Sequence, residues 1–214
     1  MTLKDDFVST NIKVKTAFVI LCVAAFLSNI SFRTSSWAKI QKNPIHVIHF
    51  GLWSICSDPN NDMIEACSTT LYDTSTAWMA AVQSLVIIGY IGTLSSLGLV
   101  TLYIWTKRCR KSKEAAFISG GTSIVTGVLY LIGCIVFGAK WTVVYPSRIG
   151  QNSQLDYGFG LSVVAAITEM IGGVIMILST RAAALESQKS SVTTTFRTEK
   201  NQLQDGNEHY DLSA

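Results

Sequence analysis

Two cysteines in the first third of the chain have the spacing of a covalent cross-link. Cys56 and Cys67 are separated by ten residues, and the segment 57–62 between them has the composition of a turn. In an oxidising compartment two such thiols can form a disulfide that closes a small ring. In the loop-entropy description, a ring of this size stabilises the folded state by about 3 kcal/mol. We therefore predict a disulfide between Cys56 and Cys67.

A second chemically distinctive group is the carboxyl of Glu169, which lies in the middle of an apolar stretch. A carboxylate in hydrocarbon costs several kcal/mol unless it is neutralised or paired, and the apolar stretches contain no Lys, Arg or His. We expect a protonated Glu169 that forms hydrogen bonds to other helices. The expected partners are Gln83, Tyr90 and hydroxyls such as those of Ser95 and Thr122. The alternative role is a site for a cation or a partner subunit.

The remaining candidates for chemistry are one cysteine and two histidines. Cys109 lies in the basic run 107–113 beside an apolar stretch, which is the setting of reversible palmitoylation. A plain thiol at the membrane surface is the alternative interpretation. His46 and His49 are too few for a metal site, and on one strand they would point to opposite faces. The sequence shows no nucleophile–histidine–acid set and no phosphate-binding glycine loop, so we predict no enzyme, metal or cofactor.

The chain that carries these residues has the composition of a membrane protein. Hydrophobic residues make up 49% and charged residues 14%, whereas a soluble domain has about a quarter charged residues. At about 1.5 Å per residue, a stretch of about 20 apolar residues crosses a hydrocarbon core of about 30 Å. The first of the stretches is predicted to be retained rather than cleaved, because Phe26, Leu27 and Asn29 make a poor signal-peptide cleavage site. The four predicted spans are 16–32, 78–105, 115–138 and 159–180.

Basic residues predict the orientation, because the cytoplasmic flanks of membrane spans are enriched in Lys and Arg. The N-terminal segment, the run 107–113 and the tail hold twelve basic residues, against five in the other two loops. Both termini are therefore predicted to be cytoplasmic. The loops 33–77 and 139–158 then lie outside, where a disulfide persists. Because the basic run adjoins a span, it favours a role in topology over nucleic-acid binding.

The spans divide the chain into a predicted transmembrane domain, 1–185, and a disordered cytoplasmic tail, 186–214. Trp78, Trp105 and Trp141 each fall at a predicted span end. An amphipathic indole prefers the headgroup region, so we expect these three rings to anchor the spans there.

The loop 33–77 is long enough to fold outside the membrane. Residues 45–50 and 63–72 are rich in β-branched and aromatic side chains and are predicted strands, with a third strand near 37–40. The expected result is a hairpin whose arms are bridged by the two cysteines.

One set of residues in this loop is shared with a known family. Trp37 is followed by Gly51-Leu52-Trp53, Cys56 and Cys67, in that order and between the first two of four spans. In this combination the chain resembles the claudin superfamily, which includes epithelial membrane proteins, peripheral myelin protein, lens fibre membrane protein and calcium-channel gamma subunits. The resemblance implies a left-handed four-helix transmembrane bundle that carries an extracellular antiparallel sheet. Four strands would come from the first loop and one from 141–145.

Other residues bear on the branch of the superfamily. Claudins usually carry an arginine where the second span begins, and this chain has Gln83 there. Gln83 and the run 156–159 are more similar to the myelin and epithelial membrane protein branch. The chain ends in Tyr210-Asp211-Leu212-Ser213-Ala214 rather than in the Tyr-Val of many claudins. Docking of the C-terminus to a PDZ scaffold is therefore not expected.

The resemblance implies a protein of the plasma membrane and of cell–cell junctions. The edges and tips of the sheet would pair with further copies or other claudin-like proteins, in the same membrane and across the gap between cells. Such polymers would form or tune a paracellular barrier or pore. The alternative is an auxiliary subunit or trafficking modulator of a channel or another membrane protein.

Overall fold

The structure is a computed structural model that describes residues 12–43, 46–57, 66–69, 77–106, 113–144 and 152–179. Residues up to Ile177 make one compact unit, and a second unit begins at Leu178. The predicted tail and residues 107–112 of the basic run lie outside the described residues.

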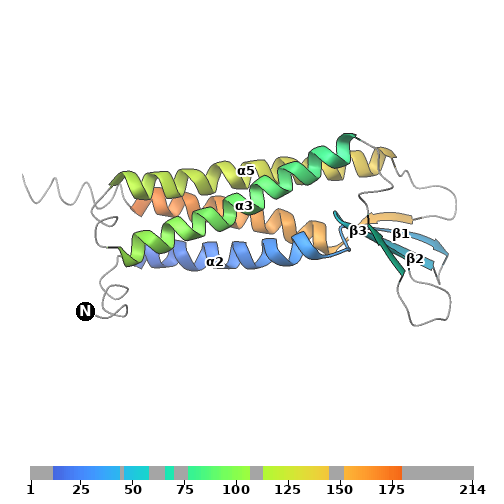
Figure 1. The fold of residues 1–214 in the computed structure, drawn as a ribbon, viewed down its shortest axis with the longest axis horizontal. Helices are drawn as coiled ribbons and strands as arrows, with labels where there is room; N and C mark the ends of the chain where they lie inside the picture. Colours follow the sequence, from blue (N-terminus) through green and yellow to red (C-terminus); the bar gives the residue numbers. More distant parts are fainter. Residues whose placement is uncertain are drawn as a thin grey trace, which may run out of the picture. The chain divides into compact units, whose positions relative to one another are not determined.

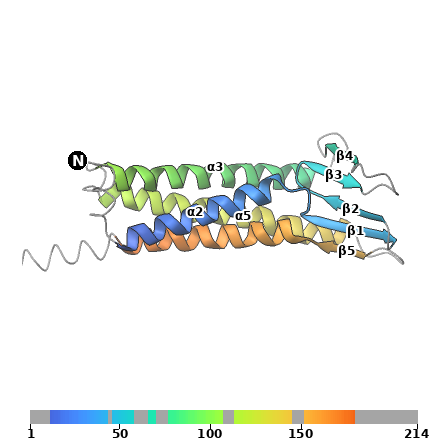
Figure 2. The same cartoon turned by 90° about the horizontal axis from the view of Figure 1, so that it is seen from below.

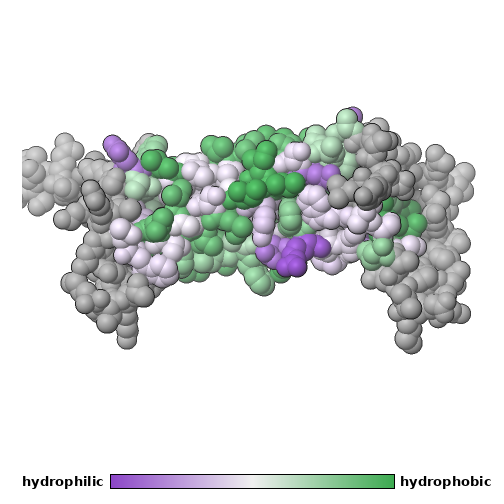
Figure 3. All heavy atoms as spheres, viewed as in Figure 1, coloured by the Kyte–Doolittle hydropathy of each residue, from purple (hydrophilic) through white to green (hydrophobic). Residues whose placement is uncertain are grey.

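Within the described ranges, four helices are long and apolar enough to cross a membrane. They are α2 (Ile12–Arg33), α3 (Ala77–Trp105), α5 (Lys113–Val144) and the fourth helix, Tyr157–Ser179. Figures 1 and 2 show the helices packed side by side. Figure 3, seen from the same direction as Figure 1, shows hydrophobic side chains over much of the described helical surface. An isolated helix of this composition would bury its apolar side chains in lipid. The predicted class, a four-span membrane bundle with a small sheet, is confirmed.

Five strands of the described residues form one antiparallel sheet in the order β4-β3-β2-β1-β5. They are β1 (Ala38–Asn43), β2 (His46–Phe50), β3 (Ser54–Ser57), β4 (Ala66–Thr69) and β5 (Asn152–Leu155). In this register Lys39 lies opposite both His49 and Gln154. Because side chains alternate along a strand, Ala38, Ile40 and Phe50 lie on the opposite face. The sheet follows directly on the end of α2, as Figure 2 shows.

The predicted position of the fifth strand is wrong. We expected it within 141–145, after a span that ended near residue 138, but α5 continues to Val144 and β5 begins at Asn152. The reason is that the buried stripe of α5 does not stop at the span end: Phe137 and Trp141, one turn apart, are both fully buried. Packing of these two rings keeps the segment helical.

Two apolar clusters form the core. The sheet-end cluster consists of Trp37, Ala38, Ile40, Leu52, Met79, Val82, Val86, Tyr130, Cys134, Phe137, Trp141 and Ala166. The far-end cluster consists of Val14, Ala17, Leu21, Val100, Tyr103, Ile104, Ala116 and Met176. Between them along α3, α5 and the fourth helix lies a polar layer of buried side chains, namely Thr93, Ser96, Ser119, Ser123, Thr126 and Glu169.

Candidate functional site

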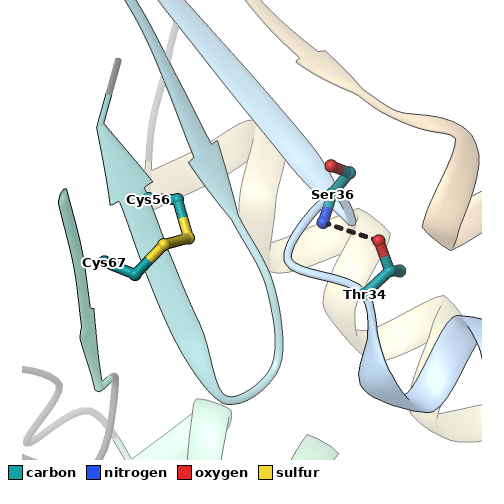
Figure 4. Close-up of a disulfide and its surroundings, with 4 residues drawn as sticks. All are labelled: Thr34, Ser36, Cys56 and Cys67. Carbon is teal, nitrogen blue, oxygen red and sulfur yellow. Dashed lines mark hydrogen bonds between the residues drawn. A yellow bond between two sulfur atoms is a disulfide. The ribbon is translucent and has the colours of Figure 1, made fainter. Parts of the chain in front are cut away.

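Three residues of the claudin pattern, Trp37, Gly51 and Trp53, lie at the C-terminal end of α2. The last carbonyls of a helix have no partner within it and must be satisfied from outside. One of them, Ile30 O, accepts the backbone N–H of Thr34 at 3.0 Å. Figure 4 shows the turn that follows, in which Ser36 N donates to Thr34 Oγ1 at 3.3 Å.

Two tryptophan side chains satisfy the next two carbonyls. Trp37 Nε1 donates to Ser31 O and Trp53 Nε1 donates to Phe32 O, each at 2.8 Å. Trp37 begins the sheet and Trp53 stands in the turn between β2 and β3, so both bonds join the sheet to α2. We call this pair of bonds the indole clamp. A neutral hydrogen bond of this kind contributes about 1 kcal/mol, and leaving the carbonyl buried without it costs more.

Gly51 is required by close packing against the chain that leaves α2. A Cβ atom at this position would lie 2.6 Å from Ser35 Cα and 2.8 Å from Thr34 O, which are both backbone atoms. The Gly51 N–H donates to Ser54 O at 2.8 Å and closes the turn between β2 and β3. A side chain here would therefore push Trp53, next but one in the turn, away from its carbonyl.

Leu52 and Gln83 attach the same turn to α3. The Leu52 side chain is fully buried, and its carbonyl accepts a hydrogen bond from Gln83 Nε2 at 2.7 Å. Gln83 was expected among the partners of Glu169, and that expectation is wrong. Gln83 lies in the second turn of α3, at the sheet end, whereas Glu169 lies in the polar layer. The residues Gly51-Leu52-Trp53 thus hold α2 and α3 together at one end.

The predicted disulfide joins Cys56 of β3 to Cys67 of β4, which are opposite each other in the register. Figure 4 shows it bridging the two strands. β4 is one of the two edge strands and has one neighbour in the described sheet, so the cross-link adds a covalent bond to a strand that is paired on one side. Among the described residues, Cys22 and Cys134 are free.

Aromatic rings fill the space between the sheet and the helices. The ring centroid of Phe137 is 5.2 Å from that of Trp37 and 5.8 Å from that of Trp141, and Phe50 lies 5.0 Å from Trp141 on its other side. Trp141 was expected in the headgroup region, but it is 1% exposed, so that prediction is wrong. The extension of α5 carries this ring beneath the sheet. Trp105, at the end of α3, is 46% exposed.

Asp156 joins three strands to the fourth helix. Its backbone N–H donates to Trp37 O at 2.9 Å, and its Oδ1 accepts the N–H of Tyr157, the first residue of the helix, at 2.9 Å. The same carboxylate lies 3.6 Å from Lys39 Nζ and 3.5 Å from His49 Nδ1. The Asp156 carboxylate therefore accepts a hydrogen bond at the start of the fourth helix and also forms an ion pair with a strand residue.

The fourth helix also docks on the exit from α2 through Gly158. Gly158 N donates to Ser36 O at 2.9 Å, and Gly158 O accepts the hydroxyl of Ser31 at 2.8 Å. A Cβ atom at Gly158 would lie 2.7 Å from Ser36 O. α2 and the fourth helix thus meet at the segment that precedes β1.

Glu169 lies apart from this site, and its partners differ from those expected. Thr93 Oγ1 lies 2.7 Å from Glu169 Oε2, and Thr126 Oγ1 lies 2.7 Å from Oε1. Ser95 and Thr122, which we expected there, instead donate to carbonyls of their own helices. Ser95 is two residues from Thr93, so the rotation of α3 decides which of the two hydroxyls faces Glu169. Thr122 lies about one turn before Thr126 on α5, so its position along the helix separates it from the carboxyl.

The positions of two of the predicted residues relative to this site are not described. Cys109 lies outside the described residues, as does the side chain of His46. His49 pairs with Asp156, as described above. Within the described ranges no group of three or more His, Cys, Asp or Glu side chains could hold a metal ion.

The fold and the site define a class: a four-span membrane protein whose sheet is fastened to the ends of its helices. The sequence model of the PMP-22/EMP/MP20/Claudin family matches residues 11–176. The match covers most of the chain and all five strands, and the chain belongs to this family. No curated protein matches it.

Proposed function

We propose that this chain acts at contacts between cells, where it adheres and polymerises through its sheet to form or tune a paracellular barrier or pore. The observation that carries the proposal is the indole clamp. Trp37 and Trp53 bind successive carbonyls at the end of α2, so the sheet is fixed to the bundle instead of hanging from a loop. A fixed surface loses less conformational entropy when it binds a neighbour.

The proposed orientation puts both termini in the cytoplasm and the sheet outside the plasma membrane. It is supported by the disulfide, which persists in oxidising compartments. It is also supported by the excess of basic residues on the opposite side. An epitope inserted in the segment between β3 and β4 should be labelled on intact cells. Labelling only after permeabilisation would reverse the orientation and remove the proposed role.

The proposal is tested by expressing the tagged chain in cells that lack junctional polymers. We expect enrichment at contacts between two expressing cells over free surface, polymers in freeze-fracture images, and a changed transepithelial resistance. The variant Trp53→Phe removes the indole N–H while keeping an aromatic ring, and should lower contact enrichment at equal surface amount. Trp105→Phe, at the end of α3, is the matched control. Uniform surface distribution of the parent chain would contradict the proposal.

A second candidate function is that of an auxiliary or trafficking subunit of a channel or other membrane protein. It is favoured by Gln83, which stands where claudins usually carry an arginine and is already engaged with Leu52 O. This role predicts co-purification with a channel and no polymers in the same cells. The two outcomes separate the candidates.

A further inference from the structure

The polar layer contains one group for which the proposed function has no use, the carboxyl of Glu169. Its side chain is 1% exposed, and it projects from the fourth helix between α3 and α5. Each of its two oxygens lies 2.7 Å from a threonine hydroxyl, Thr93 on α3 and Thr126 on α5. Three helices therefore meet at one ionisable group in the middle of the bundle.

Glycines bring the three helices close enough for this arrangement. A Cβ atom at Gly92, beside Thr93, would overlap the methyl group of Thr126. One turn after Glu169, a Cβ atom at Gly173 would lie 2.7 Å from Gly120 O and 2.9 Å from Ser123 Cβ. Both threonine hydroxyls reach the carboxyl only because these positions lack side chains, so the site is built by the backbone packing itself.

The number of hydrogens around the carboxyl discriminates between its two protonation states. Thr93 Oγ1 also lies 3.0 Å from Gly89 O, and Thr126 Oγ1 lies 2.8 Å from Thr122 O. Each hydroxyl has one hydrogen, so an ionised Glu169 leaves two hydrogens for four short oxygen–oxygen contacts. A protonated Glu169 supplies a third hydrogen. It then donates to one threonine, which keeps its helix carbonyl, and accepts from the other.

The charges around the site favour the protonated form as well. In the described parts of α3, α5 and the fourth helix the only Lys, Arg or His residues are Lys113 and Lys140, and each is more than three turns of α5 from Thr126. No cation of these three helices therefore lies near Glu169. The other ionisable side chains on the adjoining turns are Tyr90 on α3 and Tyr130 and Cys134 on α5, and none of them carries positive charge. An ionised carboxylate there would keep a full charge in a low-dielectric interior.

We propose that Glu169 is a proton-binding site, in which one proton, shared with Thr93 and Thr126, holds α3, α5 and the fourth helix together. The proton is a bound ligand: the threonines and the glycine approaches form its site, and its loss leaves an unpaired charge in the bundle. Binding of the proton and packing of the three helices are therefore linked, each favouring the other.

Infrared difference spectroscopy on the purified full chain in lipid nanodiscs tests the proposal directly. We expect a carbonyl-stretch band of a protonated carboxylic acid at neutral pH that is absent in Glu169→Gln. Thr93→Val or Thr126→Val should shift this band, because each removes a hydrogen-bond partner of the acid. Thr168→Val is the control, since that hydroxyl donates to Val164 O on its own helix. A carboxylate band that disappears in Glu169→Gln, with no acid band in the parent chain, would overturn the proposal.

A stability measurement provides an independent check. The amide of Glu169→Gln can donate to one threonine and accept from the other, as the neutral acid does. We expect it to shift the unfolding equilibrium by less than about threefold, the size of one hydrogen bond inside a membrane bundle. A loss of tenfold or more would indicate an ionised carboxylate and overturn the proposal. Both measurements use the isolated chain, so neither depends on the proposed role at cell contacts.

Discussion

The sheet end and the polar layer solve the same problem, the pairing of buried polar groups, in different ways. At the sheet end, Trp37, Trp53 and Gln83 donate to backbone carbonyls that a helix end or a turn leaves unpaired. In the polar layer the helix backbone is already paired, so Thr93 and Thr126 reach for another side chain. A helix end therefore supplies unpaired acceptors, whereas in the middle of a helix Thr93 and Thr126 contact both a carbonyl of their own helix and a carboxyl on another one.

This difference has a consequence for rigidity. The sheet end combines backbone acceptors, stacked rings and a disulfide. Its apolar cluster, which contains Trp37 and Phe137, is larger than the far-end cluster. The polar layer depends on close helix approach and on two side-chain hydrogen bonds. We therefore expect substitutions at the sheet end to cost more stability than substitutions in the layer.

The largest effect is expected for Trp37→Ala. The ring is fully buried, packs on Phe137 and Phe159, and donates to Ser31 O. Truncating a buried tryptophan costs about 3–5 kcal/mol. The free energy of unfolding in mixed micelles measures it, with Trp105→Ala as the control because that ring is about half exposed. Equal losses in the two variants would show that the clamp does not hold the sheet.

The next effect is that of Cys56→Ser. Opening the ring between β3 and β4 should lower the free energy of unfolding by about 3 kcal/mol, mainly through the entropy of the unfolded chain. The parent chain under reducing conditions should lose the same amount. Cys22→Ser, which removes a free thiol in α2, is the control and should change little. A Cys56→Ser variant as stable as the parent would contradict a structural role for the cross-link.

Two glycines of α3 form a matched pair for the helix contacts. A Cβ atom at Gly89 would lie 2.7 Å from Tyr130 Cδ2 and 3.2 Å from the Tyr130 Cα, whereas at Gly98 nothing lies within 4 Å. Gly89→Ala should therefore cost about 1–3 kcal/mol through overpacking. Gly98→Ala should not destabilise the chain. The thermal unfolding temperatures of the two variants are compared in one detergent. Equal unfolding temperatures would contradict the close approach of α3 to α5 at Gly89.

Local patterns were enough to predict the sheet end in outline. Long apolar stretches have few alternatives to spanning helices, and Cys56 and Cys67 have a spacing that a hairpin can bridge. The predicted strand 45–50 overlaps β2, which covers His46–Phe50. What a pattern could not supply was the acceptor of each indole, because Ser31 O and Phe32 O become available only where α2 ends.

The partners of Glu169 could not be predicted for a related reason. Ser95 and Thr93 are two residues apart, and only the rotation of α3 in the bundle decides which hydroxyl faces the fourth helix. Likewise, α5 extends beyond the apolar stretch because its last rings pack on other elements. Phe50 of β2 contacts Trp141, and Trp37, which follows α2, contacts Phe137. These contacts form only in the folded unit. Such partners come from other elements, so no window of sequence contains them.

The smallest effect is expected for Asp156→Asn, and it separates charge from capping at the sheet end. Asparagine keeps an oxygen for the Tyr157 N–H, so the helix start is retained. The ion pair with Lys39 is lost. Because the Lys39 side chain is 39% exposed, we expect the free energy of unfolding to fall by only about 0.5 kcal/mol. A double-mutant cycle with Lys39→Gln measures the coupling, which should fall further at high salt. A loss as large as that of Cys56→Ser would contradict this estimate and would mean that charge contributes as much as the disulfide to the stability of the sheet end.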